Sequence, residues 1–380
     1  MYGSMRKMTS GLNDENTIHN VTEMLDEAQL EELPHWNTIN DFLERLDPSE
    51  LEDVIQKLVK YLLNMKVLQN GKVRNRYWEI LIDGTRLFQI GEEDSDDNLF
   101  KVHKNKDGTI KWVEYYYYVV EAKILLPSDI VISILTEFCE NDEDVNPYDD
   151  DKESQEKKKQ DCELKAFYRM VEKLKKLFGN VRICIVMDSL YAGEPVIEIC
   201  ESNNWRYIIR FKEGSVKSIA DGFNNAAQEK KGGYRVFTKH GGDKKYEYLN
   251  AYNYRGHYIN IVRYTEEGQE YPFWYLTNLP INMKNCVDFV AYARDRWKIE
   301  NQGFNIQKNH GYELKHKFSK NKQAIKNHYY LIQIAHAISQ FFEKGLDILK
   351  ELKMKIYEIH ERIKHDFAYS LMSTHTVKRE

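Results

Sequence analysis

The chain has 380 residues, 42% of them apolar, and a formal net charge of −5 at pH 7. This is the composition of a globular protein with a substantial core, and the sequence contains no run of about 18 apolar residues that would span a membrane. The five cysteines are scattered and form no CxxC pair, which predicts reduced thiols in a cytoplasmic protein and excludes a zinc site of the usual spacing.

The N-terminal part of the chain is predicted to be helical. Apolar positions recur with helical period over 16–24, 36–46 and 49–64. The residues Asp47-Pro48-Ser49-Glu50 are typical of a helix end followed by a new helix start. Residues 1–76 are therefore expected to form a helical segment.

From residue 77 onward the pattern changes from helices to strands. Runs rich in apolar, β-branched and aromatic residues predict a series of strands. They lie at 79–85, 112–126, 130–138, 183–187 and 205–211. An acidic loop is expected over 91–109 and a charged surface linker over 140–160.

Two helices separate the later strands. Apolar residues at helical spacing predict a helix over 164–178, and Gly179 is suited to end it. A second helix is expected over 195–203. The run 183–187 is continuously apolar, as in a central strand buried on both faces, and Asp188 follows it directly.

The last part of the chain combines a β region with helices. Short aromatic-rich segments with glycine turns over 233–276 predict an antiparallel β insertion. Helical patterns return over 282–307, 327–342 and 347–363. The predicted class is mixed α/β, with the core order strand-strand-strand-helix-strand-helix-strand, then the insertion, then a helix.

Three carboxylates are placed at the ends of core elements or on the late helix. Asp83 is expected to end the first strand, Asp188 follows the fourth, and Glu300 lies on the helix after the insertion. Magnesium prefers oxygen ligands, and two ions about 3.5–4 Å apart can activate an attacking oxygen and stabilise a leaving one. The pattern favours a metal site for phosphoryl transfer, although each aspartate alone is also typical of a turn or a helix cap.

The helix that carries Glu300 has a regularly spaced charged face. Residues four apart share a broad face of a helix, and here they are Tyr292, Arg296, Glu300, Phe304 and Lys308. This face suits a metal and phosphates, or it forms surface ion pairs at i,i+4. Residues 284–326 contain ten Lys or Arg and four Asp or Glu, a local charge of +6 that suits a polyanionic ligand.

Several motifs together resemble the bacterial insertion-sequence transposases of the DDE type, whose catalytic core is RNase H-like. The resemblance covers roughly residues 34–340. Its motifs are Leu33-Pro34-His35-Trp36-Asn37-Thr38, Ile82-Asp83-Gly84-Thr85, Met187-Asp188-Ser189-Leu190-Tyr191-Ala192, Tyr207-Ile208-Ile209-Arg210-Phe211-Lys212-Glu213-Gly214 and Arg296-Trp297-Lys298-Ile299-Glu300-Asn301.

The resemblance implies that Asp83, Asp188 and Glu300 are the catalytic and metal-binding triad, with two Mg²⁺ ions that Mn²⁺ can replace. It also implies that the β region is the insertion of the cut-and-paste branch. The expected segments are 1–76 (helical, a DNA-binding domain or a truncated one), 77–214 (first part of the RNase H-like core), 215–281 (β insertion), 282–345 (last part of the core) and 346–380 (C-terminal helical tail).

That branch carries a tyrosine–arginine–glutamate–lysine signature whose non-acidic members grip DNA. In this sequence Tyr292 lies one residue before the expected position and Lys308 one residue after it. The residues expected to contact DNA are Arg296, Lys298, Lys308, Tyr292, Trp297 and Lys212. Trp297 is expected either to stack on an unpaired base or to pack into the core.

By this resemblance the partner is double-stranded DNA, at the transposon ends and in the target, bound by a homodimer in the bacterial cytoplasm. Hydrolysis at the transposon end would free a 3′-hydroxyl, which would then attack target DNA in line. Two alternatives stay open. One is a plain RNase H-like nuclease with the same carboxylates, and the other is a catalytically silent copy that only binds DNA.

Overall fold

The computed structural model describes residues 5–25, 30–65, 73–74, 76–142, 145–148, 160–230, 233–239, 243–345 and 356–370. The chain start at which a truncated domain was expected (1–4), most of the expected linker (149–159) and much of the expected tail (346–355 and 371–380) lie outside these residues. The chain divides into two compact units, Met1–Val54 with Asn305–Glu380, and Ile55–Phe304.

The first unit consists of helices from both ends of the chain. They are α1 (Met5–Leu12), α2 (Glu15–Leu25), α3 (Trp36–Arg45), α10 (Asn305–Asn309), α11 (Lys322–Gly345) and α13 (Ile356–Tyr369), with α4 (Pro48–Asn64) beginning here and ending in the second unit. Buried Asn327 of α11 donates hydrogen bonds to the carbonyls of Leu43 (2.8 Å) and Leu46 (2.7 Å) at the end of α3. Across the described residues, no helix is both long enough and apolar enough to cross a bilayer.

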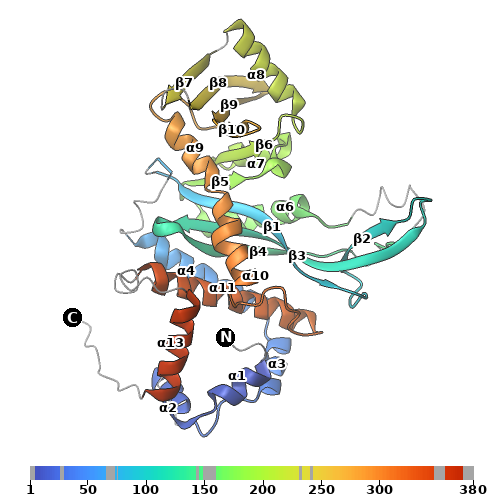
Figure 1. Cartoon of the computed structure of the whole chain (residues 1–380), viewed down its shortest axis with the longest axis vertical. Coiled ribbons are helices and arrows are strands. Elements are labelled where there is room, and N and C mark those ends of the chain that lie inside the picture. The colour runs from blue at the N-terminus through green and yellow to red at the C-terminus, as the bar shows by residue number, and fades with distance from the viewer. Residues whose placement is uncertain are drawn as a thin grey trace. The chain divides into compact units, whose positions relative to one another are not determined.

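The described residues of the second unit form one sheet of ten strands (Figure 1). The strands are β1 (Trp78–Ile90), β2 (Leu99–Lys104), β3 (Ile110–Leu126), β4 (Ile130–Cys139), β5 (Ile183–Met187), β6 (Arg206–Phe211), β7 (Tyr234–Lys239), β8 (Lys244–Tyr254), β9 (His257–Glu266) and β10 (Phe273–Thr277). Their order is β2-β3-β1-β5-β6-β10-β9-β8-β7, and β4 pairs with β3. The unit also contains α6 (Glu163–Phe178), α7 (Glu194–Ser202), α8 (Lys217–Glu229), α9 (Cys286–Arg294) and the π-helix η5 (Ile299–Phe304).

The core of this sheet has the strand arrangement of an RNase H-like fold. β3 is antiparallel to both β1 and β4, whereas β5 runs parallel to β1 and to β6. All five residues of β5 are buried, because the strand lies between two parallel neighbours. The predicted mixed α/β class and the order of the core elements are confirmed.

Two segments differ from the sequence expectations. The region 91–109 is not a loop throughout, because its second half contains β2, which pairs with β3 from Leu99↔Tyr116 onward. Charged residues alternate with the apolar residues of this short strand and obscure its pattern. The helix α8, which the sequence analysis did not assign, precedes the β insertion, and β10 of the insertion pairs with β6. The insertion therefore extends the core sheet.

The single helix predicted over 282–307 is interrupted. After α9 the backbone N–H groups of Lys298 and Ile299 bond to the carbonyls three residues earlier (2.8 and 3.1 Å), and the wider turns of η5 follow. Turns of different width do not keep residues four apart on one face. Phe304 is accordingly buried in the core, whereas the side chain of Glu300 is 41% exposed.

Candidate active site

Asp83 on β1 and Asp188, which directly follows β5, lie level with each other at one end of neighbouring parallel strands. The last parallel pair of β1 and β5 is Leu81↔Val186, and each aspartate lies two residues beyond it. The expectation that Asp83 ends its strand is wrong. β1 continues beyond Asp83 to Ile90 as an antiparallel partner of β3. The Asp-Gly pair is consequently part of a strand and makes no turn.

Arg296 connects the first and third carboxylates of the expected triad. Its Nη1 lies 2.9 Å from Oδ2 of Asp83 and 2.7 Å from Oε1 of Glu300. Burial disfavours the charge of Arg296, but the two carboxylates outweigh it and raise its pKa. Two acids that lie 217 residues apart in the sequence are thus held on either side of one cationic nitrogen.

The buried carboxyl of Asp83 is held in an acidic environment. Burial raises its pKa to about 7, the Arg296 guanidinium opposes this, and the carboxylates of Glu300, Asp188 and Glu163 add to the rise. Four acidic side chains therefore share one electrostatic neighbourhood. A concentration of negative charge of this kind is typical of a cation site.

Glu163 is the acidic group that the sequence analysis missed. It is the first residue of α6, where it accepts a hydrogen bond from the hydroxyl of Tyr118 and lies 3.5 Å from that of Tyr191. Burial raises the pKa of Glu163, the Tyr118 hydroxyl lowers it, and Asp188 raises it further. The available signal was topological: β4 runs in the direction of β1, so the helix that follows β4 begins at this edge of the sheet.

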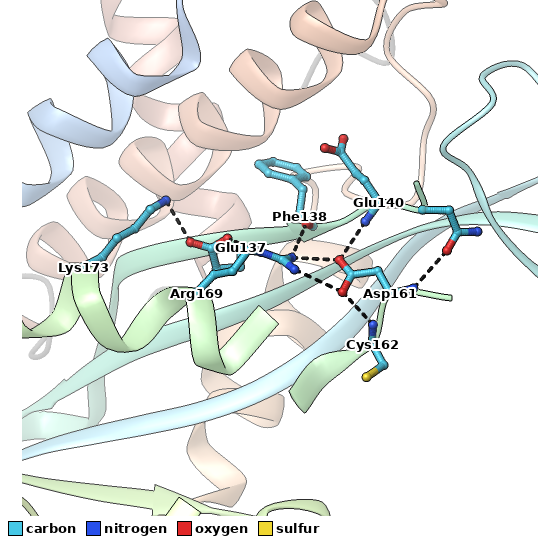
Figure 2. A network of polar contacts seen from close by, with 8 residues as sticks. Glu137, Phe138, Glu140, Asp161, Cys162, Arg169 and Lys173 are labelled. Carbon is cyan, nitrogen blue, oxygen red and sulfur yellow. Dashed lines mark hydrogen bonds and ion pairs between the residues drawn. The ribbon is translucent and has the colours of Figure 1, made fainter. Parts of the chain in front are cut away.

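A network of ion pairs fixes the start of α6 to the end of β4 (Figure 2). Arg169 of α6 donates to Asp161 (2.8 Å), to Glu137 (3.2 Å) and to the carbonyl of Phe138 (3.1 Å). Lys173 adds an ion pair to Glu137 at 2.9 Å. Because Asp161 lies two residues before Glu163, the network fixes the turn from which Glu163 reaches the other acids.

Gly84, the residue after Asp83, gives Tyr118 and Glu163 room to meet. A Cβ at this position would lie 2.5 Å from the Tyr118 hydroxyl oxygen and 2.6 Å from the Glu163 carboxyl carbon. We therefore expect Gly84→Ala to lower the free energy of unfolding by about 1–3 kcal/mol through overpacking, as measured by urea denaturation. Gly214→Ala is the control, since a Cβ there meets nothing within 4 Å. Equal stability of the two variants would contradict this account.

A buried ion pair lies beneath η5. Lys123 and Glu121 of β3 are 0% exposed, and Nζ of Lys123 lies 3.2 Å from Oε2 of Glu121. Gly303 of η5 packs closely on this lysine, because a Cβ at Gly303 would lie 3.4 Å from the Lys123 side chain. Glu121 is also the cross-strand partner of Asp83, so the pair supports β1 and η5, which carry Asp83 and Glu300.

The other residues expected to contact DNA are found in different settings. Lys298 makes 2.7 Å ion pairs with Asp129 and Asp295, and Tyr292 packs against the hydrophobic core. Trp297 is 45% exposed and therefore does not pack into the core. Lys212 is exposed in the turn after β6, whereas Lys308 belongs to α10 in the first unit. Their contacts with DNA stay a prediction.

The carboxylate oxygens of the site fit a divalent cation, but the acidic side chains are not arranged to coordinate one ion together. Carboxylate oxygens are the ligands that Mg²⁺ and Mn²⁺ prefer. Within the described ranges, no group of three or more His, Cys, Asp or Glu side chains is arranged so that it could hold a metal ion. The guanidinium of Arg296 lies between Asp83 and Glu300 instead. A bound cation would have to share or replace this contact.

The strand order and the carboxylates at its edge define an RNase H-like core. Residues 159–338 match the family model of the transposase DDE domain, a span that contains Glu163, Asp188 and Glu300 and begins after Asp83. The match identifies this part of the chain as a transposase DDE domain. A comparison with curated proteins found no match.

Proposed function

We propose that the chain is the transposase of a bacterial insertion sequence, from the cut-and-paste branch, which cleaves DNA at the element's ends and joins the freed ends to target DNA. The observation that supports this most directly is the grouping of Asp188, Glu300 and Glu163 around the buried carboxyl of Asp83, whose pKa is raised. Mutually repelling carboxylates gain most from a bound cation, and the phosphodiester of DNA is a substrate on which such a cation acts.

In this proposal Asp83, Asp188 and Glu300 would hold Mg²⁺, with two ions as the proposed number. A divalent cation held there supplies activation of the attacking oxygen and screens the charge of the phosphate. Glu163 adds a fourth negative charge to the field at Asp188 and Asp83. The protein's part is mainly to position these groups on rigid strands and helices.

Arg296 is proposed to exchange the carboxylates for a DNA phosphate. Its Nε is buried and has no hydrogen-bond partner among the described residues, so the guanidinium has unused donor capacity. If Asp83 and Glu300 held a cation, their attraction for Arg296 would weaken. A guanidinium binds phosphate in two-point geometry, which would fix the strand beside the acids.

Trp297 and the nearby cations would complete the grip on DNA. The guanidinium groups of Arg210 and Arg296 each lie 5.8 Å from the Trp297 ring centroid. An exposed indole near two cations suits stacking on an unpaired base next to the cleaved phosphate. Lys298, Lys308, Lys212 and Tyr292 are proposed as further DNA contacts, and a homodimer as the form that holds two ends.

The experiment is an end-cleavage assay on labelled duplexes that carry the element's own ends, with a supercoiled plasmid as target. We expect nicked product with a free 3′-hydroxyl in Mg²⁺ or Mn²⁺, none in EDTA, and end–plasmid joined products in the complete reaction. Nicking without joined products would favour the plain nuclease. Binding without nicking would favour the catalytically silent copy.

A further inference from the structure

A hairpin arm extends the sheet away from the proposed active site. We call residues 99–112 the β2–β3 arm: it comprises β2, its turn and the start of β3. Figure 1 shows that these strands extend beyond the core strands β1 and β5. The arm contains four lysines and one acidic residue in a chain whose net charge is −5. The lysines, all exposed, are Lys101, Lys104, Lys106 and Lys111.

The arm has its own internal packing. Phe100, Val113 and Tyr115 form a small buried cluster on one face, against which Ile90, Val102, Ile110 and Val145 pack. At the tip, the N–H of Asn105 donates to the carbonyl of Thr109 at 2.8 Å, and Gly108 adopts the left-handed conformation that closes the turn. A hairpin with its own cluster holds its shape as it leaves the core.

The opposite face of the arm presents a flat aromatic pair. The rings of His103 and Trp112 are stacked, with centroids 3.9 Å apart and planes within 5°. Trp112 is 43% exposed, and His103 is also held by Glu114 at 3.0 Å. An exposed aromatic ring beside lysines is an arrangement that nucleic-acid contacts use, since bases stack on the ring and phosphates pair with the cations.

Side-chain contacts connect this face to the proposed active site. Glu114 pairs with Arg86 of β1, and the Arg86 guanidinium lies 4.0 Å from the ring centroid of Tyr116. The rings of Tyr116 and Tyr118 meet edge to face at 6.4 Å, and Tyr118 donates to Glu163. The arm is thus fixed in direction relative to the acids of the same unit.

The distance along the arm corresponds to about one turn of DNA. Glu121 lies opposite Asp83, and Trp112 lies nine residues further along β3. At about 3.3 Å per residue, the aromatic pair lies up to about 30 Å from the acids. B-form DNA advances about 3.4 Å per base pair, so that distance spans about nine base pairs.

The geometry points to a second DNA contact that the family resemblance does not assign. We propose that the β2–β3 arm binds duplex DNA about nine base pairs from the cleaved phosphodiester, with its four lysines on phosphates and the His103–Trp112 pair against the groove. This inference rests on the proposed function for the identity of the DNA. The arm sets how much duplex beside the cleavage position the protein engages.

The competing explanation is that the lysines only protect an edge strand from pairing with other chains. β2 is indeed at the edge of the sheet. Lys111 and Trp112 lie where β3 pairs with β2 alone, so this part of β3 is itself an open edge. Edge protection therefore accounts for Lys101, Lys104 and Lys111, but it requires neither Lys106 in the turn nor an exposed indole at Trp112.

The test is the salt dependence of binding to two duplexes that carry one element end. The long duplex extends 20 base pairs to each side of the cleavage position, and the short one extends only five. For the native chain and a variant with Lys101, Lys104, Lys106 and Lys111 replaced by Gln, the affinity is measured by anisotropy without divalent metal. Each lost phosphate contact lowers the slope of log affinity against log salt by about 0.9. We expect the variant's slope to fall by about 3 to 4 on the long duplex and to stay unchanged on the short one.

A charge-matched variant and a cross-link complete the design. Lys165, Lys175, Lys176 and Lys217, all exposed on α6 and α8, are replaced by Gln as the control. Trp112 is replaced by a photoreactive benzoylphenylalanine, which should cross-link about nine base pairs from the cleavage position.

Equal slopes for the arm variant and the native chain, or a cross-link absent from that region, would overturn the proposal. If the arm variant self-associates while its salt slope stays unchanged, the proposal is also overturned. That result would show that the lysines protect the edge strand from pairing with other chains. Neither readout requires cleavage. If the chain cross-links in that region but never nicks DNA, the proposed function is refuted, whereas the DNA contact of the β2–β3 arm stands.

Discussion

Glu300→Gln and Asp188→Asn are each expected to lower Mg²⁺-dependent nicking of end DNA by at least about 10³-fold while the variants still bind DNA. Each substitution keeps the shape of the side chain and removes the negative charge that would hold a cation. Losing one preorganised electrostatic group typically costs 10²–10³ in rate, and losing a metal ligand also weakens the activation of the attacking oxygen. The measurement is a single-turnover nicking rate, with DNA binding followed separately in EDTA.

Glu194→Gln is the matched control for Glu300→Gln. Glu194 is 37% exposed and pairs with Arg255 at 2.8 Å, whereas Glu300 is 41% exposed and pairs with Arg296 at 2.7 Å. The two substitutions therefore remove carboxylates of similar exposure from ion pairs of similar length, although Arg255 is exposed and Arg296 is buried. Only Glu300 belongs to the acidic group. Nicking by Glu300→Gln at the rate of the control would exclude Glu300 as a participant in the chemistry.

Much of the core could be predicted because its signals are local. The apolar run 183–187 has no polar interruption, as a strand between two parallel neighbours requires, and Asp188 follows it directly. The spacing of Arg296 and Glu300 predicted an ion pair at i,i+4, which the structure contains. Each of these features depends on residues that are close together in the chain.

The features that could not be predicted depend on contacts between distant residues. Arg296 turns toward Asp83, which is 213 residues away, and nothing in the local sequence reveals the interrupted helix that allows this contact. Glu163 becomes part of the site only through the pairing of β1 with β3, which brings Tyr118 over Gly84. The loop expected over 91–109 contains β2, and lysines mask this short strand, whose partners in β3 lie six to seventeen residues later.

The second large effect is expected on stability, because Asp83 is a buried acid. We expect Asp83→Asn to raise the free energy of unfolding of the metal-free protein at pH 8 by up to about 4 kcal/mol, which is three pKa units at about 1.36 kcal/mol each. Burial, the largest cause, together with the neighbouring carboxylates raises the pKa of Asp83 from 3.8 to about 7. The amide of asparagine has the same shape and never carries that charge.

The pH dependence follows from the direction of the shift. Between pH 4 and 7 the folded protein keeps a proton on Asp83 that the unfolded chain releases, so the native protein loses stability as the pH rises through this window. Above pH 7 the full destabilisation from the buried Asp83 carboxylate is present. Below pH 4 Asp83 is protonated in both the folded and the unfolded state, and this destabilisation vanishes. The advantage of Asp83→Asn should therefore be largest at pH 8, about half as large near pH 5.5, and absent at pH 4.

Urea denaturation at pH 4, 5.5 and 8 in EDTA measures this dependence, with Asp221→Asn, an exposed carboxylate of α8, as the control. Added Mn²⁺ should make the native protein more stable than Asp83→Asn at pH 8. A cation that binds the folded native protein stabilises it, and the asparagine variant lacks one ligand. An advantage that is the same at every pH would mean that Asp83 is not held in its protonated form. If Asp83→Asn stays the more stable variant at pH 8 in Mn²⁺, the cation does not bind at Asp83.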